Sequence, residues 1–404
     1  MSRVAGGLLA LLAVAGALLG AASPAAAATF TVTKTPDSAD GSCDAADCSL
    51  REAVLAANAV SGADVVTVPA GTYTLTIDGS DGFGDTAAAG DLDVAGLTID
   101  GAGALNTFVD GVGAKRPFDA TGTVEINGLT VQHGRATLGG GIRNAGTLTL
   151  TAVAVSANDI GTGFNAGGGI YSTGSLTLVN STVSGNTAFS GAGISNASGT
   201  LAMTNSTVSG NTAINRDSGT GNYGGINNNG PATITNSTIA ANSAPAGQGG
   251  GLRNSVPATL KNTIMAQNAG GDCLGPVAAG STHNLDSDAS CGFVAPTDRT
   301  GDPKLGPLQP NDGQTATHAL LADSPALDAG TSDGCPATDQ RNAPRPQGPL
   351  ATWGRTNAGR RSGTSPGNSA SRPTRRTRIP TISGTQASGA SSAAQASPIP
   401  GPTR

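Results

Sequence analysis

Carboxylates that could act as a catalytic pair are scarce in the central part of this chain. Enzymes that cleave polysaccharides use two carboxylates for acid and base work, or a cationic or metal site that stabilises a carbanion. Between residues 120 and 270 the only acids are Glu125, Asp159 and Asp217. They fall in different copies of the repeat described below, further apart than the roughly 5 to 10 Å of a catalytic pair unless loops bring them together. We therefore assign no catalytic residue; the candidates for an enzyme alternative are Asp159, Asp217, Arg143 and Arg253.

Five side chains at equivalent positions of the repeat could instead bind sugar hydroxyls. Each follows a Gly-rich block, and together they are Arg143, Tyr171, Ser195, Asn227 and Arg253. Residues at one position of a stacked repeat line one face, so we predict a solvated face of Arg, Tyr, Ser and Asn. The alternative is an ordinary solvent-exposed surface that binds no ligand, because a fold by itself implies no function.

One acidic cluster is a candidate calcium site. Its members are interleaved with glycine, and they are Asp78, Asp81, Asp85, Asp91 and Asp93. Oxygen ligands on a flexible Gly-rich loop suit calcium, although the spacing differs from that of the EF-hand loop. A solvated Asp/Gly loop is the alternative, and we expect no cofactor other than calcium. The sequence contains no phosphate loop, nucleophile elbow or zinc signature.

The N-terminus has the pattern of a secretory signal, which we predict to span residues 1–28. Arg3 precedes an apolar run from Val4 to Leu19, and small residues follow up to Ala28. This is the order of charged, apolar and small residues in a cleaved signal. About 16 apolar residues fall short of the roughly 20 that span a bilayer. We therefore predict a secreted or cell-surface protein that begins near Thr29 and has no transmembrane segment.

Five cysteines in an exported chain favour disulfides, because the destination is oxidising. Cys43 and Cys48 are close enough to close one loop, Cys273 and Cys291 could close another, and Cys335 is left over. Metal binding is the weaker alternative. The chain has no CxxC pair, and the histidines that could assist are His133, His283 and His318.

Related segments recur five times between residues 148 and 268. Each ends in asparagine, and these terminal residues are Asn158, Asn186, Asn211, Asn242 and Asn268. Apolar and small polar residues alternate within each segment, which is the period of a strand. One unit cannot bury its apolar face alone, so the units must stack as coils. We predict an all-β parallel β-helix over residues 64–270, with further coils in residues 271–349.

A second asparagine column lies six residues before the first. Its members are Asn180, Asn205, Asn236 and Asn262. Asparagine tolerates the left-handed backbone of tight corners, and stacked amides can hydrogen-bond from coil to coil. We predict that both columns are structural ladders. Glycosylation of the Asn-Ser-Thr sequons at Asn180, Asn205 and Asn236 is the alternative.

A solenoid needs a cap over its open end, and we assign this role to residues 29–63. Ser49-Leu50-Arg51-Glu52 is a capping box followed by helix-forming residues. It predicts a short amphipathic helix over residues 49–60. The predicted disulfide between Cys43 and Cys48 would hold this helix in place.

Two motifs resemble a known family. Cys48-Ser49-Leu50-Arg51-Glu52-Ala53 matches the signature of bacterial secreted CSLREA-motif proteins, which resemble right-handed parallel β-helix proteins of the pectin-lyase-like type. The segment from Ser324 to Gly330, Ser-Pro-Ala-Leu-Asp-Ala-Gly, is similar to the choice-of-anchor region that often ends such chains. The resemblance covers residues 30–348 and implies a right-handed parallel β-helix without implying an activity.

The chain departs from that family after Gln347. Residues 350–404 contain eight Arg and no acid, whereas residues 1–349 hold 14 Lys and Arg against 27 Asp and Glu. We hypothesise that this tail is a frameshift product, and a Ser/Thr/Pro/Arg-rich linker that spans or binds a cell wall is the alternative. In either case its composition predicts disorder.

The sparse acids favour a non-enzymatic extracellular β-helix that displays a polar face for adhesion or glycan binding. The expected partners are polysaccharides or cell-surface glycans. Nucleic acid is disfavoured, because residues 1–349 are acidic. The alternative is a polysaccharide lyase or glycoside hydrolase of the pectin-lyase-like class.

Overall fold

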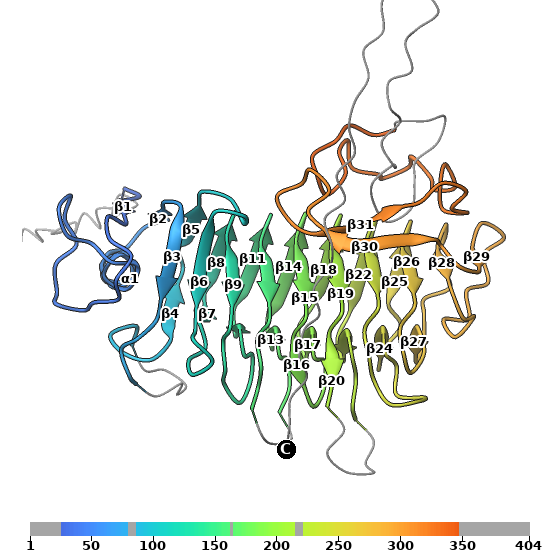
Figure 1. Ribbon diagram of the computed structural model, residues 1–404, viewed down its shortest axis with the longest axis horizontal. Coiled ribbons are helices and arrows are strands. Elements are labelled where there is room, and N and C mark those ends of the chain that lie inside the picture. The colour runs from blue at the N-terminus through green and yellow to red at the C-terminus, as the bar shows by residue number, and fades with distance from the viewer. Residues whose placement is uncertain (1–25, 80–85, 162–164, 215–220, 347–404) are drawn as a thin grey trace, which may run out of the picture. The chain divides into compact units, whose positions relative to one another are not determined.

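The computed structural model describes residues 26–79, 86–161, 165–214 and 221–346 (Figure 1). The predicted tail, residues 350–404, lies outside the described residues. So does the predicted signal sequence, except for its last three residues.

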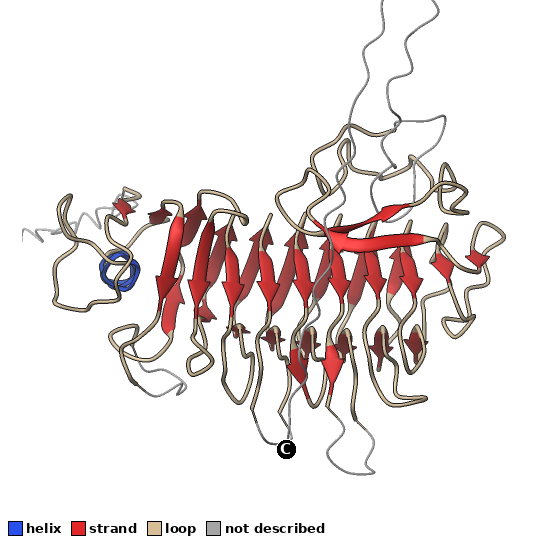
Figure 2. Cartoon of the chain, in the orientation of Figure 1, coloured by secondary structure: helices blue, strands red, loops and turns tan. Residues whose placement is uncertain are grey.

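Short parallel strands form three long sheets, which we call sheets A, B and C (Figure 2). Sheet A has the order β1 (Thr29–Thr31), β2 (Val65–Val68), β5 (Thr98–Gly101), β8 (Thr123–Asn127), β11 (Thr147–Thr151), β14 (Ser175–Val179), β18 (Leu201–Thr204), β22 (Ala232–Thr235) and β25 (Thr259–Lys261). Sheet B has the order β3 (Gly71–Thr74), β6 (Thr107–Asp110), β9 (Thr130–Gln132), β12 (Ala154–Ser156), β15 (Thr182–Ser184), β19 (Thr207–Ser209), β23 (Thr238–Ala240), β26 (Ile264–Ala266), β28 (Leu285–Asp286) and β29 (Arg299–Thr300). Sheet C has the order β4 (Leu92–Ala95), β7 (Phe118–Thr121), β10 (Ile142–Asn144), β13 (Ile170–Ser172), β17 (Ile194–Asn196), β21 (Ile226–Asn228), β24 (Leu252–Asn254) and β27 (Cys273–Leu274).

Neighbouring strands in each sheet come from successive turns of the chain, so the predicted parallel β-helix is confirmed. The register places like residues side by side, as in Leu148 beside Leu176 and Leu176 beside Leu201. One buried column of sheet A contains Ile99, Ile126, Leu150, Leu178, Met203, Ile234 and Leu260. Such columns supply the core that a single coil could not bury.

The first asparagine column forms a continuous ladder inside the solenoid. The Nδ2 of Asn158 donates to the Oδ1 of Asn186 at 2.9 Å, and the pattern repeats through Asn211 and Asn242 to Asn268. Each Nδ2 also donates to a backbone carbonyl, such as that of Val183 for Asn211. This ladder was predicted from the repeat, and it satisfies amides that water cannot reach.

The second column differs from the prediction, because a later segment of the chain binds most of it. One amide link joins Asn205 to Asn180 at 3.1 Å. Asn236 instead donates to the Sγ of Cys335, and Asn262 exchanges two hydrogen bonds with Thr331. Asn205 and Asn236 are buried, so in the fold described their amides are not open to a glycan.

The C-terminal part of the described chain lies against sheet B. Strands β30 (Leu305–Gln309) and β31 (Thr317–Leu320) form an antiparallel pair that crosses the solenoid coils in Figure 1. Thr182 donates to the carbonyl of Ala316 at 2.5 Å, and Thr207 donates to Gln340 at 2.8 Å. A further short pair, β16 (Thr187–Ala188) and β20 (Thr212–Ala213), extends two of the loops between sheets B and C.

The N-terminal cap contains helix α1 (Leu50–Ala59), close to the predicted range. The predicted capping box is present, since Ser49 Oγ accepts from the amide of Glu52 and the Glu52 carboxylate accepts from the amide of Ser49. Arg51 is fully buried and binds Asp37 and the carbonyls of Ala87 and Gly90. The cap is therefore tied to the first coils by hydrogen bonds as well as by packing.

Both predicted disulfides are present, between Cys43 and Cys48 and between Cys273 and Cys291, and Cys335 is free. Disulfides are typical of an oxidising, extracellular environment. Across the described residues no helix is both long and apolar enough to cross a membrane.

Candidate functional site

Sheet C brings the predicted polar side chains into one column. Arg143 pairs in register with Tyr171, Tyr171 with Ser195, Ser195 with Asn227, and Asn227 with Arg253. The prediction of a solvated face is wrong for the middle of this column, where Ser195 is 2% and Asn227 8% exposed. The amide of Asn227 donates to Ser190, on the loop before β17, at 3.0 Å.

At one end of the column, Arg143 belongs to a buried ion network. Its guanidinium donates to the carboxylate of Asp119 at 2.8 Å, and Asp119 also pairs with Arg116. Arg116 in turn pairs with Asp91, a predicted calcium ligand. Asp91 and Asp119 are buried, so these charges hold the first coils together and are shielded from a solution ligand.

At the other end, the half-buried residues Arg253 and Tyr223 form a polar cluster with the exposed residues Asn229 and Ser255, and we call this cluster the Arg253 patch. The guanidinium carbon lies 5.0 Å from the centre of the Tyr223 ring, within cation–π range. The same guanidinium donates to the side-chain oxygens of Asn229 and Ser255. The Ser255 hydroxyl donates to Asn229 at 2.6 Å, so the patch is fixed by its own hydrogen bonds.

The remaining predicted catalytic and calcium residues are dispersed or lie outside the described residues. Asp159 accepts the amide of Gly161 at 2.9 Å. Asp78 pairs with Lys115 at 2.6 Å, and this contact lowers the pKa of the Asp78 carboxyl. The candidate residues that lie outside the described residues are Asp81, Asp85 and Asp217. Asp78, Asp91 and Asp93 do not form a group with ligand atoms close enough for one ion.

A different set of carboxylates could hold a cation, and sequence reasoning missed it. Asp272, Asp286 and Asp288 place one oxygen each within 4.8 Å of the others, the one such group in the described residues. Asp272 ends the inner asparagine ladder, because its Oδ1 accepts from the Nδ2 of Asn268 at 2.7 Å. The Asp-x-Asp spacing at residues 286–288 was the available signal, but only the fold brings Asp272 to it.

The environment of Asp286 favours its protonated form. Burial, together with the neighbouring Asp288 and Asp272 carboxylates, raises the pKa of Asp286 to about 7, although the backbone amides of Cys291 and Asp288 act to lower it. Asp286 is 1% exposed. This carboxyl is therefore shielded from any polymer, and its proton affects stability.

We expect the stability of the protein to fall as pH rises from about 4 to 8. A carboxyl with a raised pKa in the folded state confers stability that is complete below its unfolded pKa and lost as pH rises through about 7. Asp286→Asn should remove most of this fall, on the order of 4 kcal/mol. Melting temperatures across this pH range measure it, with exposed Asp312→Asn as the control. Identical profiles for Asp286→Asn and the wild type would contradict the assignment.

The structure also brings a serine and a histidine together. Ser209 Oγ and His318 Nε2 lie 2.8 Å apart, and His318 Nδ1 binds the carbonyl of Gly306. Both side chains are buried between sheet B and the β30–β31 pair. A substrate cannot reach this pair in the described fold, so it acts as a polar contact between two segments.

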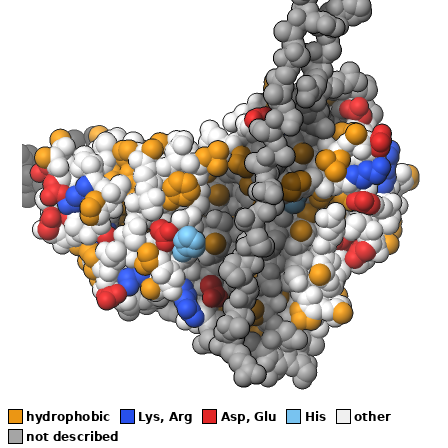
Figure 3. Space-filling model, in the orientation of Figure 1, with side chains coloured by type: hydrophobic (Ala, Val, Ile, Leu, Met, Phe, Trp, Pro, Cys, Tyr) orange, Lys and Arg blue, Asp and Glu red, His pale blue; other side chains and the backbone are white. Residues whose placement is uncertain are grey.

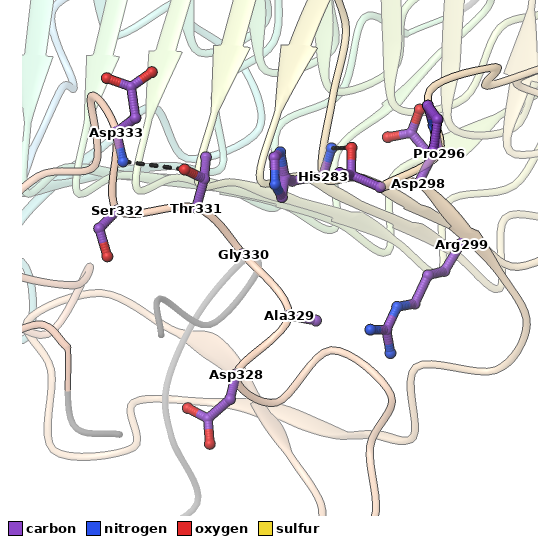
Figure 4. Close-up of a pocket in the computed structure, with 11 residues that line it drawn as sticks. His283, Pro296, Asp298, Arg299, Asp328, Ala329, Gly330, Thr331, Ser332 and Asp333 are labelled. Atoms are coloured by element: carbon purple, nitrogen blue, oxygen red, sulfur yellow. Dashed lines mark hydrogen bonds between the residues drawn. The ribbon is translucent and has the colours of Figure 1, made fainter. Parts of the chain in front are cut away.

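A cavity of about 550 Å³ lies where the last coils meet the returning C-terminal segment (Figure 4). One wall contains His283 and residues 296–299, and the other is formed by residues 328–333. These walls are far apart in the sequence, so no sequence pattern placed them together.

On the face shown in Figure 3, charged side chains are sparse and lie singly or in small groups.

Comparisons with protein-family models, with curated proteins and with solved structures found no match to this chain. The function is therefore argued from the chemistry of the described side chains.

Proposed function

We propose that this protein is a secreted or cell-surface β-helix that binds glycans through the Arg253 patch without cleaving them. The observation that carries the proposal is the half-buried Arg253 side chain, whose guanidinium lies over the Tyr223 ring and beside the exposed Asn229 and Ser255 side chains. Export is supported by the signal pattern at residues 1–28 and by the two disulfides.

The patch offers the groups that a neutral sugar chain needs. Arg253 and the Asn229 amide nitrogen can donate to sugar oxygens, while the Ser255 oxygen has a second lone pair that can accept from a sugar hydroxyl. The Tyr223 ring supplies an amphipathic surface for the C–H groups of a sugar. The internal hydrogen bonds hold the patch before a ligand arrives, which reduces the entropy lost on binding.

The partners of the candidate catalytic residues favour binding without cleavage. The alternative lyase or hydrolase would combine Asp159 or Asp217 with Arg143 or Arg253. Arg143 is bound to buried Asp119, and Asp159 is bound to the amide of Gly161. Cleavage needs a carboxylate pair or a proton-abstracting site beside the sugar, and Arg253 has amide and hydroxyl partners instead.

We expect Arg253→Ala to weaken glycan binding about tenfold, the loss of one charge-assisted contact worth about 1.4 kcal/mol. Affinity electrophoresis in gels that contain plant, algal or bacterial polysaccharides measures the retardation. Lys304→Gln removes an exposed positive charge outside the patch and is the matched control. Equal retardation of Arg253→Ala and the wild type would rule out the patch as the binding site.

A further inference from the structure

The cavity at the C-terminal end is built on a corner of the solenoid, away from sheet C. Thr282 bridges to Lys261 of sheet A, and Leu285 pairs with Ile264 of sheet B. His283 therefore occupies the corner position that Asn262 has one coil earlier, and both residues have a left-handed backbone, with φ of 58° and 51°. The Arg253 patch lies on sheet C and does not contribute to this cavity.

Hydrogen bonds to the same corner fix both walls. Thr331 and Asn262 exchange two hydrogen bonds of 2.9 Å, which tie the 328–333 segment to the coil. Across the cavity, Asp298 accepts from the amide of Asn284 at 2.8 Å. Arg299 donates to the carbonyl of Pro325 at 3.1 Å and so connects the two chain segments. A cavity held in this way keeps its form before a ligand binds.

The cavity has a polar lining with both donors and acceptors. In Figure 4 the Arg299 side chain extends from its wall toward Ala329, while Ser332 and Asp328 come from the opposite segment. Arg299, Asp328 and Ser332 are exposed. Among the described residues, Pro296 and Ala329 supply the apolar side chains of the lining, and His283 supplies its one aromatic ring.

The charges of the lining disfavour an anionic ligand. The lining contains three carboxylates, those of Asp298, Asp328 and Asp333, and one guanidinium, that of Arg299. Asp333 pairs with Lys261 at 2.8 Å, so the surplus is small and negative. Neighbouring sugar hydroxyls can accept from a guanidinium and donate to a carboxylate at the same time. The volume lies within the range of small-ligand sites, about 300 to 1,000 Å³, and suits one or two sugar rings.

We propose that this cavity is a second glycan subsite, which binds a single neutral, hydroxyl-rich sugar unit at a chain end or branch. The proposal rests on the proposed glycan-binding function and adds to it a site and a class of ligand. Arg299 donates to sugar oxygens, and Asp328 accepts from sugar hydroxyls. The Arg253 patch would contact the body of the polymer while the cavity holds a terminal unit.

The test uses the full chain and free monosaccharides as probes, namely glucose, galactose, mannose and xylose, with glucuronate as the anionic comparison. Saturation-transfer NMR and calorimetry measure binding. Ser332→Trp fills the cavity from an exposed position, and Arg299→Gln removes its guanidinium while keeping a long polar side chain. We expect each variant to lose neutral monosaccharide affinity by about tenfold or more, with unchanged retention on polysaccharide gels. Ser332→Trp leaves the hydrogen bonds of both walls in place, so it should also leave the melting temperature unchanged. Arg253→Ala should leave monosaccharide binding intact.

Two results would overturn the proposal and separate it from the function proposed above. Polymer retention that depends on Arg253, without monosaccharide binding or with binding unaffected by Ser332→Trp, rejects the cavity as a subsite and leaves the patch standing. Stronger binding of glucuronate than of the neutral sugars rejects the assigned ligand class. Absence of both polymer and monosaccharide binding rejects the proposed function together with the subsite.

Discussion

Asn211→Ala is expected to lower the free energy of unfolding by about 3 to 5 kcal/mol, because it interrupts the inner ladder at its centre. The Asn211 Oδ1 accepts from the backbone amide and the Nδ2 of Asn186, at 3.0 and 2.9 Å. Its Nδ2 donates to Asn242 and to the carbonyl of Val183. Alanine leaves these buried groups without partners, and each costs about 1 to 3 kcal/mol where water cannot enter.

Urea titration followed by circular dichroism measures this effect. Asn106→Ala is the matched control, since Asn106 is exposed and its side-chain amide donates one hydrogen bond of 3.3 Å, to the carbonyl of Ala102. The control should change stability by less than about 1 kcal/mol. A similarly small loss for Asn211→Ala would show that the ladder has little energetic weight. Hydrogen exchange should also become faster at the amide of Asn186, which loses its acceptor.

Arg51→Met should destabilise the N-terminal cap by about 3 to 5 kcal/mol, the usual cost of breaking a buried ion pair by removing one partner. Arg51 Nε and Nη2 donate to the two Asp37 oxygens, at 2.7 and 3.1 Å. Its remaining donors bind the carbonyls of Ala87 and Gly90. Methionine has a similar length and no donor, so the Asp37 charge and these carbonyls lose that partner.

The location of the destabilised segments distinguishes this prediction from a general loss of stability. Hydrogen exchange should increase in α1 and the first coils and stay unchanged at the central strands β14 and β18. Arg51→Lys should not restore stability, because an ammonium cannot reproduce the planar set of donors. Lys304→Met, which removes an exposed cation outside the cap, is the control. Equal melting curves for Arg51→Met and this control would show that the buried contacts of Arg51 do not stabilise the cap.

Local sequence patterns predicted the coils well because each coil repeats one pattern. The terminal asparagines indicated the inner ladder, since one residue type at one position must stack on itself in a solenoid. The capping box at Ser49 and Glu52 predicted α1 because a helix start depends on a few adjacent residues. The disulfides followed from the spacing of the cysteines together with the predicted export of the chain.

Contacts between distant segments were the part that sequence reasoning could not reach. The outer asparagines carry the same signal as the inner ones, yet Asn236 and Asn262 bind Cys335 and Thr331. The partners of the outer asparagines depend on where the C-terminal segment lies, and the spacing of the repeat does not predict that position. The burial of Ser195 and Asn227 depends likewise on how the neighbouring loops fold over sheet C.

Each candidate binding region also depends on contacts that the sequence did not predict. The sequence placed Arg253 in the polar column, but Tyr223 and Ser255 join it only through loop and turn geometry. The cavity was absent from the sequence analysis because its walls come from His283 with residues 296–299 and from residues 328–333.

One experiment tests binding without cleavage most directly. The purified full chain is incubated with plant, algal and bacterial polysaccharides, and both bound protein and released sugar ends are measured. We predict binding to at least one polysaccharide, weakened by Arg253→Ala, with no release of reducing or unsaturated ends. Release of such ends, abolished by Asp159→Asn or Asp217→Asn, would contradict it and identify an enzyme.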